Sequence, residues 1–469
     1  MRQLALLFTI FVLPLAACGE SALTGPETVQ TVEAEPDADV THDGDWAGTL
    51  NAGGAPLRLV LEVRGETAVL ISVDQGGARL PIEVTQSDAD GFAGTIASAG
   101  ASLDLDRIDD TTLAGIFSQG GADLPLTLSR NGAGSALAET ETASGPDPVS
   151  GNDEDILVMS GDVSLAGSLR RPEGAGPFPA ILLLNGSGAQ DRNATVAGQP
   201  LFGVLADALA ERGIASLRLD DRGVGGSDAV APASPHDLAE DAAAAMSALR
   251  DQEGVAAQCV GLLGHSEGGL IAFLAADAAD PAFLLSLAGM HMTMAETLYD
   301  QSEALILASG AGQVAADQNR ALQDAMFGVM RDESIEDYPD ALTEALTALG
   351  FPEDAARQQG AIWGQDYSIA ALDLDPAAAM SAYEGPVHAF FGERDLQALA
   401  GPQSQALIEA RGDLPTEVRV IPGVNHLFQD AETGLPQEYA SAPHAMSPEA
   451  LSAIANAAEA LIHQTCETE

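Results

Sequence analysis

Hydrophobic and polar positions alternate in two different ways along this chain. Between about residues 41 and 130, apolar and polar residues alternate one by one behind Gly-containing turns. From about residue 155 onward, continuous apolar runs are separated by Ala-rich segments. Alternation with a period of two is typical of strands with one buried face, whereas apolar runs between helical segments indicate a parallel sheet covered on both faces. The pattern therefore predicts two domains of different fold class.

The first region is built from a repeated unit, a turn that ends in Ala and is followed by alternating apolar residues. The copies are GGAPLRLVL from Gly53, GGARLPIEV from Gly76, AGASLDL from Ala99 and GGADLPLTL from Gly120. Three copies also follow an Ala-Gly pair, as if each hairpin began in the same way. Four hairpins give about eight antiparallel strands, which predicts a small barrel or sandwich, with a closed sheet favoured.

The second region predicts a mainly parallel, eight-stranded sheet with helices on both faces. The segment from about 290 to 383 interrupts the alternation, because it is mostly helical and lies between two predicted strands. We interpret it as an inserted lid. The predicted strands are ILVMS, VSLAGSL, PAILLLN, IASLRLD, CVGLLG, AFLLSLA, PVHAFFG and TEVRVIP.

Polar, acidic stretches set the domain boundaries. Residues 19–40 predict a flexible tether, and residues 131–154 predict a linker between the domains. The antiparallel β domain is accordingly expected at 41–130, and the α/β domain at 155–469.

The N-terminus predicts export from the cytoplasm. MRQLALLFTIFVLPLAAC, residues 1–18, has one positive charge, an apolar stretch and small residues before Cys18, which is a secretory signal too short for a stable membrane span. LAAC at its end resembles the bacterial lipobox. That resemblance implies a lipoprotein that touches a membrane only through acyl chains on Cys18, in a Gram-negative host at the outer membrane and facing the periplasm. Ordinary secretion with a coincidental cysteine is the alternative.

The charge balance excludes one class of partner. Asp and Glu number 70 against 19 Lys and Arg, and the formal net charge is −51. Such a charge repels nucleic acid, so no nucleic-acid partner is expected. It also suggests a salty habitat, where dissolved ions screen the self-repulsion.

Cys259 and Cys466 are the remaining cysteines. An oxidising compartment would let them pair, but nothing in the sequence fixes their distance, so two free thiols are the alternative. The sequence has no Cys and His spacing typical of a metal site, and no metal ion is expected.

One serine stands where an apolar strand meets a helix. In GLLGHSEGGL, residues 261–270, the five residues around Ser266 match G-x-S-x-G. A sharp strand-to-helix turn strains the serine backbone and requires small neighbours, and its hydroxyl then stands at a helix N-terminus that favours negative charge. We predict that Ser266 is a nucleophile. A tight turn that uses the serine as an N-cap is the alternative.

A lone serine is a poor nucleophile, so a carboxylate and then a histidine should follow it along the chain. Asp395 follows the strand PVHAFF, and His426 follows the strand TEVRVIP. Both lie beyond the carboxyl ends of strands, where reactive groups of open α/β sheets gather. We predict that Asp395 is the orienting acid and His426 the base. Glu393 is the alternative acid, and His291 is the alternative base.

An oxyanion needs two backbone N–H donors. We expect one from Glu267 and the other from Ser187, in a Gly-Ser-Gly turn that lets the backbone approach a carbonyl oxygen. A plain turn is the alternative for this loop. In LRLDDRGVGGSD, residues 217–228, we expect Asp220 and Arg222 to brace the site without taking part in the chemistry.

Five stretches of the second region together resemble α/β-hydrolase serine esterases of bacteria, in the branch near dienelactone hydrolases and acyl-peptide hydrolases. They are LLLNGSGAQDRN, LRLDDRGVGGSD, GHSEGGLIA, FGERDLQ and GVNHLFQDAETGLPQEY. The resemblance runs from about Asp155 to the end and implies an α/β-hydrolase fold with Ser266, Asp395 and His426 as its triad. Secreted members are similar in carrying an N-terminal β domain. Many members have His-Gly where this chain has Asn185-Gly186, which leaves the second oxyanion donor open.

These residues predict a serine carboxylesterase that hydrolyses small carboxylic esters through an acyl-enzyme on Ser266, without a cofactor. A serine peptidase of the same fold is one alternative, and it would need acidic lid residues such as Glu303, Asp332 or Glu333 to recognise a substrate terminus. A non-catalytic envelope protein that binds ligands with this fold is another. The resemblance implies short acyl groups, and the β domain is expected to be a spacer, an oligomerisation surface or a glycan or lipid contact.

Overall fold

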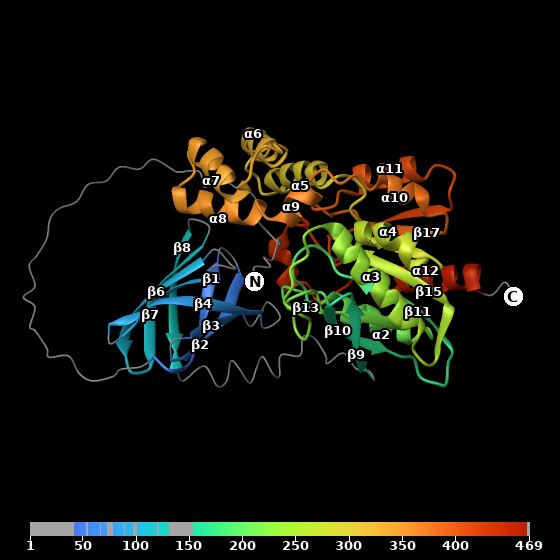
Figure 1. The fold of residues 1–469 in the computed structure, drawn as a ribbon, viewed down its shortest axis with the longest axis horizontal. Coiled ribbons are helices and arrows are strands. Elements are labelled where there is room, and N and C mark those ends of the chain that lie inside the picture. Colours follow the sequence, from blue (N-terminus) through green and yellow to red (C-terminus); the bar gives the residue numbers. More distant parts are fainter. Residues whose placement is uncertain are drawn as a thin grey trace, which may run out of the picture.

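The structure is a computed structural model with two folded units, an all-β unit and an α/β unit (Figure 1). It describes residues 42–52, 55–65, 67–72, 78–88, 90–96, 101–119, 122–130 and 153–466. The expected signal with Cys18, the tether at 19–40 and most of the linker lie outside the described residues.

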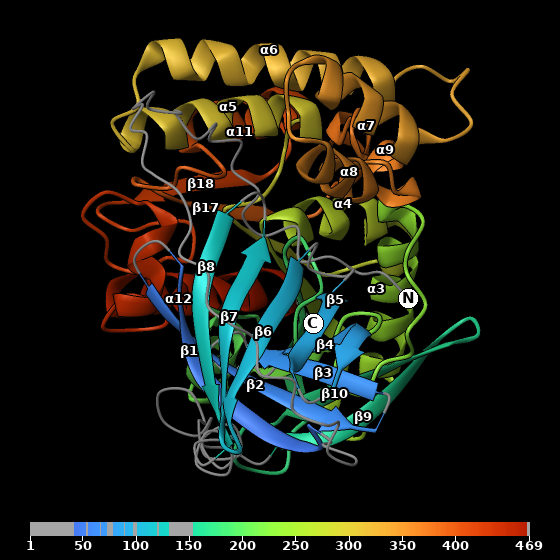
Figure 2. The same cartoon turned by 90° about the vertical axis from the view of Figure 1, so that its left-hand side faces the viewer.

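The all-β unit is a closed antiparallel barrel, which confirms the predicted β domain as a barrel and not a sandwich (Figure 2). Each strand pairs with the next, and β1 pairs with β8 to close the sheet. The Ala that ends each repeated turn begins an even-numbered strand. The strands are β1 (Gly44–Ala52), β2 (Ala55–Arg64), β3 (Thr67–Ser72), β4 (Ala78–Ser87), β5 (Gly91–Ile96), β6 (Ala101–Asp109), β7 (Thr112–Gln119) and β8 (Ala122–Ser129).

Alternating apolar residues fill the barrel. Leu103 and Leu105 of β6 are buried while Asp104 between them is exposed, and Trp46 is the largest side chain of this core. A Cβ on Gly48 would lie 2.0 Å from the carbonyl oxygen of Thr127 on β8. The glycine of this Ala-Gly pair therefore permits the close approach of β1 and β8 that shuts the barrel.

The α/β unit contains one eight-stranded sheet in the order β18-β17-β16-β15-β11-β14-β10-β9. β10 pairs antiparallel with both of its neighbours, and the other pairs are parallel, as predicted. The strands are β9 (Asp153–Ser160), β10 (Val163–Arg170), β11 (Phe178–Leu184), β14 (Ala215–Leu219), β15 (Val255–His265), β16 (Leu284–Leu287), β17 (Val387–Gly392) and β18 (Thr416–Ile421), and a short hairpin adds β12 (Thr195–Val196) and β13 (Gln199–Pro200).

The start of the α/β unit differs from the prediction. β9 begins at Asp153, so Asp153 and Glu154, which we had assigned to the linker, are strand residues paired with Arg170 and Leu169. Their acidic composition is typical of a linker, but here Arg170 of β10 and Arg218 of β14 bind Asp153.

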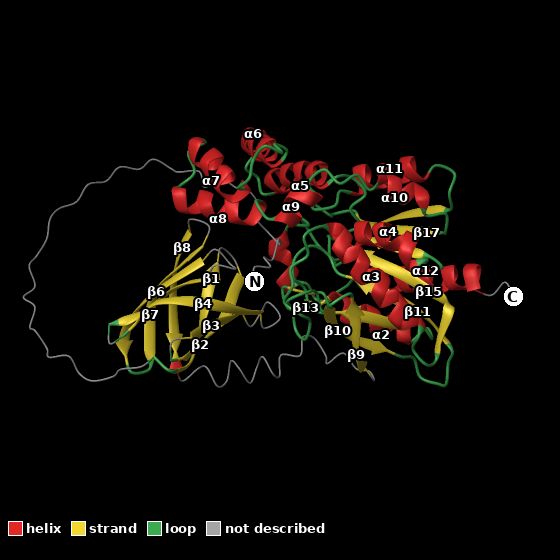
Figure 3. Cartoon of the chain, viewed as in Figure 1, coloured by secondary structure: helices red, strands yellow, loops and turns green. Residues whose placement is uncertain are grey.

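Helices cover both faces of the sheet (Figure 3). One face buries its apolar residues under α3 (Pro235–Arg250), α4 (Glu267–Ala279), α10 (Ala377–Ala382) and α11 (Ala400–Arg411). The other face is covered by α2 (Leu201–Ala210) and α12 (Pro448–Cys466). A 3-10 turn, η1 (Pro436–Ser441), precedes α12, whose last residue forms a disulfide with Cys259 of β15, with the two Cα atoms 5.7 Å apart.

The lid is a group of helices between β16 and β17 with a core of its own, formed by residues such as Met326, Phe327, Leu342 and Trp363. Its helices are α5 (Met294–Ala308), α6 (Gln313–Met330), α7 (Tyr338–Ala348), α8 (Glu353–Trp363) and α9 (Asp366–Ala371). α10 lies within the segment we had expected to be lid, but its Met380 packs into the core of the sheet. Among the described residues, no helix combines the length and apolar character needed to cross a membrane.

Candidate active site

Ser266 occupies the turn between β15 and α4. Its backbone has φ 54° and ψ −121°, a left-handed conformation that is rare outside glycine. A Cβ on Gly264 would lie 1.9 Å from the carbonyl oxygen of Gly268, and a Cβ on Gly268 would lie 2.3 Å from that of Leu184. The flanking glycines are therefore required by close packing, and the turn holds the hydroxyl out from the sheet at the first turn of α4.

His426 and Asp395 form a buried pair. Nδ1–H of His426 donates to Oδ2 of Asp395 at 2.9 Å, and each residue is 4% exposed. The other carboxylate oxygen, Oδ1, accepts from the backbone N–H groups of Gln397 and Ala398 at 2.8 and 2.9 Å. Because these contacts fix the carboxylate and place the proton on Nδ1, Nε2 of the neutral ring is left as a proton acceptor.

Ser266 and His426 line one cavity of about 90 Å³. Helices α5 and α8 of the lid form one wall of it, with Met290 just before them. The lining residues are Gly186, Ser187, Gln190, Val196, His265, Ser266, Met290, Met294, Thr297, Leu298, Gln301, Trp363, Gln397, Ala398, His426, Leu427 and Tyr439. The structure thus brings the three predicted residues together, with Asp395 behind His426. No Asp, Glu, Lys or Arg is among the described residues that line the cavity.

Residues 185–190, here called the glycine loop, lie against the serine turn. A Cβ on Gly186 would lie 3.2 Å from Cβ of Ser266, so the backbone of the loop approaches the serine closely. Ser187 lines the cavity, and Glu267 is the first residue of α4, whose N–H has no carbonyl partner within the helix. Both expected oxyanion donors therefore adjoin Ser266.

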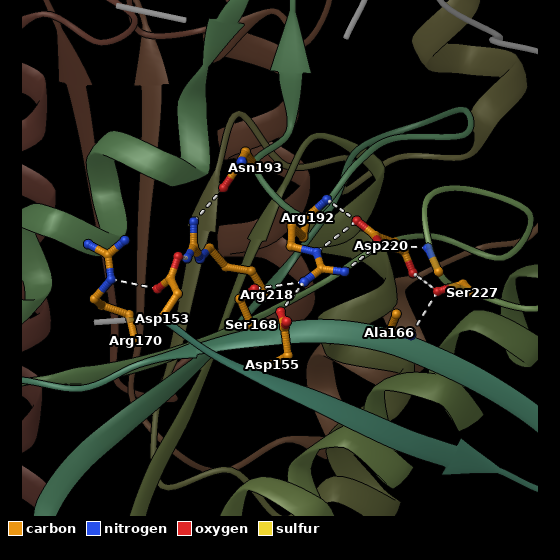
Figure 4. A network of polar contacts seen from close by, with 11 residues as sticks. Asp153, Asp155, Ala166, Ser168, Arg170, Arg192, Asn193, Arg218, Asp220 and Ser227 are labelled. Atoms are coloured by element: carbon orange, nitrogen blue, oxygen red, sulfur yellow. Dashed lines mark hydrogen bonds and ion pairs between the residues drawn. The ribbon is translucent and has the colours of Figure 1, made fainter. Parts of the chain in front are cut away.

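Ion pairs fix the chain just after the glycine loop (Figure 4). Arg192 donates through Nε and Nη2 to the carboxylate of Asp220, at 3.0 and 2.7 Å. Arg218 donates to Asn193 and to Asp153, the latter at 2.7 Å. These contacts join the residues just after the loop to the end of β14 and, through Arg218, to the edge strand β9.

Of the two residues expected to brace the site, Asp220 contacts the chain after the glycine loop, whereas Arg222 does not. Arg222 instead makes a bidentate ion pair with Asp241 of α3, at 2.6 and 2.7 Å. Asp221, which the sequence analysis did not single out, contacts the loop itself: Oδ1 accepts from Nδ2 of Asn185 at 2.9 Å and Oδ2 from N–H of Gln190 at 2.8 Å. The sequence offers one signal for it, its place inside LRLDDRGVGGSD.

The alternative acid and base lie elsewhere. Glu393 accepts from the N–H of Gly423 at 3.0 Å, and His291 is not among the residues that line the cavity. Nδ1–H of His291 donates to the carbonyl oxygen of Gln403, so its Nε2 accepts from the hydroxyl of Ser286 at 3.0 Å. Burial lowers the pKa of His291 to about 4, which keeps the ring neutral in this internal position.

His265, the neighbour of the serine, supports the histidine of the site. Its Nε2–H donates to the carbonyl oxygen of His426 at 2.9 Å, and the two rings lie 4.8 Å apart between centroids. Burial, then the nearby His426, lowers the pKa of His265 to about 3. His265 therefore stays neutral and holds the backbone that carries the base.

Comparisons with known proteins find hydrolases that are similar to this chain. A family model described as serine aminopeptidase, S33, matches residues 201–329, which include Ser266. Esterase EstD of Thermotoga maritima is 26% identical over 337 residues, 70% of this chain and 74% of that protein.

Solved structures similar to this chain include a dienelactone hydrolase from Anabaena variabilis and a proline iminopeptidase from Mycobacterium smegmatis. The first is 18% identical with a TM-score of 0.37, over 66% of this chain and 97% of its own. The second is 17% identical with a TM-score of 0.43, over 66% of this chain and 99% of its own. The order of the sheet and the turn at Ser266 are those of an α/β-hydrolase fold, and the matches to the family model and to the esterase indicate a hydrolase of the esterase and peptidase type.

Proposed function

We propose that the protein is a serine carboxylesterase. Nε2 of His426 takes the proton of Ser266 as its oxygen attacks an ester carbonyl, and Asp395 orients the ring and stabilises its charge. The backbone N–H groups of Glu267 and Ser187 bind the oxyanion, the alcohol leaves with the proton from His426, and water then releases the acid from the acyl-enzyme. The observation that carries the proposal is that Ser266, in its strained turn, shares a cavity with a histidine already paired to a buried carboxylate.

The cavity lining favours a neutral ester over a peptide with a charged amino terminus. No Asp or Glu is among the described residues that line it. The lid acids that a peptidase could use, Glu303, Asp332 and Glu333, are exposed and do not line it either. A substrate ammonium would therefore lose its hydration in this cavity without gaining a carboxylate partner.

A fluorophosphonate probe tests whether the serine is a nucleophile. The native protein should be labelled at Ser266, and Ser266→Ala should abolish labelling and ester hydrolysis. Ser381→Ala removes an exposed serine of α10 and should leave both unchanged. An unlabelled native protein would support the alternative of a non-catalytic binding protein.

The substrate class is tested with p-nitrophenyl acyl esters of increasing length beside aminoacyl and N-acyl-peptide anilides. We expect higher kcat/KM for the esters, and among them for short acyl chains, because the cavity measures only about 90 Å³. Faster turnover of the anilides would mean that the protein is a peptidase and not an esterase.

We further propose that the protein is anchored through Cys18 at the outer membrane and faces the periplasm, on the strength of LAAC at residues 15–18. Cells fed radiolabelled palmitate should yield a labelled protein in the outer-membrane fraction. Cys18→Ser should remove the label and release the protein from that fraction. A native protein without label would mean ordinary secretion.

A further inference from the structure

The glycine loop is poorly supported by packing on the side away from Ser266. A second cavity, of about 130 Å³, lies against it and is lined by Asn185, Gly186, Gly188 and Ala189 of the loop itself. Small side chains beside an empty space make few van der Waals contacts. The position of this loop must therefore depend on hydrogen bonds.

Asp221 holds the loop at both of its ends. Its two carboxylate oxygens accept from Nδ2 of Asn185 and from N–H of Gln190, and its own N–H donates to the carbonyl oxygen of Gln190 at 3.0 Å. Asn185 and Gln190 are the first and last residues of the loop. The side chain of Asp221 thus fixes the distance between the two ends of the loop that contains the Gly-Ser-Gly turn.

Glu267 holds the middle of the loop. Its side chain, 3% exposed, is hydrogen-bonded to the side chain of Ser187 and accepts from the hydroxyl of Tyr367, of lid helix α9, at 2.9 Å. Ser187 carries one expected oxyanion donor on its backbone, and Glu267 carries the other. The carboxylate of Glu267 therefore joins the two donors by a route separate from Ser266.

Burying two carboxylates so close together is unfavourable. Burial raises the pKa of Asp221 to about 7 and also raises that of Glu267, and the nearby charges of Glu267 and Asp220 further disfavour ionisation of Asp221. A neutral side chain at either position would avoid the cost of removing a charge from water. Their position suggests a role other than stabilising the fold.

We propose that Asp221 and Glu267 are positioning residues that hold the glycine loop so that the N–H of Ser187 faces the oxyanion formed at Ser266. This inference rests on the proposed esterase function. It assigns no contact with substrate to either carboxylate.

Asp221→Asn and Glu267→Gln test the assignment with little change of shape. Kcat should fall about 10- to 100-fold while KM stays within about threefold, because the donors bind the oxyanion more strongly than the ground-state ester. Affinity for a trifluoromethyl ketone, which forms a tetrahedral adduct with serine, should fall in proportion to kcat.

Asp241→Asn is the matched control. Asp241 is a buried carboxylate that lines the same cavity, but it binds Arg222 and not the loop. It should lower the melting temperature and leave kcat and ketone affinity close to native. An equal loss of kcat in Asp241→Asn, or an unchanged kcat in Asp221→Asn, would overturn the proposal.

Hydrogen exchange of the backbone separates this inference from the proposed function. The amides of residues 186–190 should exchange at least tenfold faster in Asp221→Asn than in the native protein, and no faster in Asp241→Asn. If the native protein failed to hydrolyse any ester, the proposed function would fall and the exchange rates alone would decide whether Asp221 holds the loop; unchanged rates would refute it.

Discussion

Asp395 and Glu393 stand two residues apart on one loop, yet they bind different partners. Asp395 accepts Nδ1–H of His426, whereas Glu393 accepts the N–H of Gly423. If Asp395 orients the base, Asp395→Asn should lower kcat/KM for an ester by about 10⁴-fold, because an amide in its place favours the wrong tautomer of the histidine. Steady-state kinetics with p-nitrophenyl acetate measures the change.

Glu393→Gln is the control for that substitution. Its carboxylate is exposed, so kcat/KM should stay within about threefold of native. Loss of activity in Glu393→Gln with retention in Asp395→Asn would exchange the roles of the two carboxylates. In the same way, His444→Ala is the control for His426→Ala. His444 is exposed, so its variant should keep activity, whereas His426→Ala should be inactive.

Asp221 should also leave a signature in the pH dependence of stability. Its folded pKa, raised by burial and by the facing Glu267 and Asp220 from 3.8 to about 7, exceeds the unfolded value. Between these pH values the folded protein therefore binds one more proton at Asp221 than the unfolded chain does. The contribution of Asp221 to the free energy of unfolding is complete below about pH 4 and is lost as the pH rises through 7. Asp221→Asn removes it, and the variant should gain up to about 4 kcal/mol relative to the native protein between pH 4 and 7.5.

Urea unfolding at several pH values measures this difference. Asp220→Asn provides the opposite case, because contacts with Arg192 outweigh desolvation and lower the pKa of Asp220, so its effect should be constant above about pH 4.5. A constant difference for Asp221→Asn as well would show that Asp221 is ionised throughout this range.

At the scale of elements, the N-terminus of α4 fits against the end of β11. A Cβ on Gly268 would meet the carbonyl oxygens of Leu184 and Asn185 at 2.3 and 2.5 Å. Gly268→Ala should therefore push α4 away from the glycine loop, lowering both the melting temperature and kcat, although alanine is the better helix former.

Gly401→Ala in α11 isolates the helix propensity, because a Cβ there meets nothing within 4 Å. It should raise the free energy of unfolding by about 0.5 to 1 kcal/mol and leave kcat unchanged. Calorimetry and ester kinetics on the two variants measure both effects. A stabilised, active Gly268→Ala would mean that the loop and helix adjust easily to one another.

The sequence predicted the strands and helices well and their contacts poorly. Strand positions follow from apolar runs that must be buried, and the order of nucleophile, acid and base follows from the order of strands, so the fold class could be inferred. Asp221 escaped prediction because its role arises only where the ends of β11 and β14 meet, and the sequence does not encode that distance in any local pattern. For the same reason, the pairing of Cys259 with Cys466 stayed open in the sequence analysis, and α10 was wrongly assigned to the lid.

At the scale of the whole molecule, one covalent bond joins distant parts of the α/β unit. The disulfide links Cys259 in the central strand β15 with Cys466 at the end of α12, residues separated by 207 positions. Closing so long a loop removes much conformational freedom from the unfolded chain. The bond also ties down the last helix of a protein whose net charge of −51 opposes compaction.

Reduction should therefore destabilise the native protein by roughly 2 to 5 kcal/mol, measured as the shift in urea unfolding with and without dithiothreitol. Activity at 25 °C should persist, because neither cysteine lines the cavity at Ser266. A double variant, Cys259→Ala with Cys466→Ala, should start at the lower stability and be insensitive to dithiothreitol. Equal sensitivity of the variant and the native protein to dithiothreitol would show that the reductant acts elsewhere. A native protein that is stable only when oxidised would fit the proposed periplasmic location, since disulfides persist in such compartments.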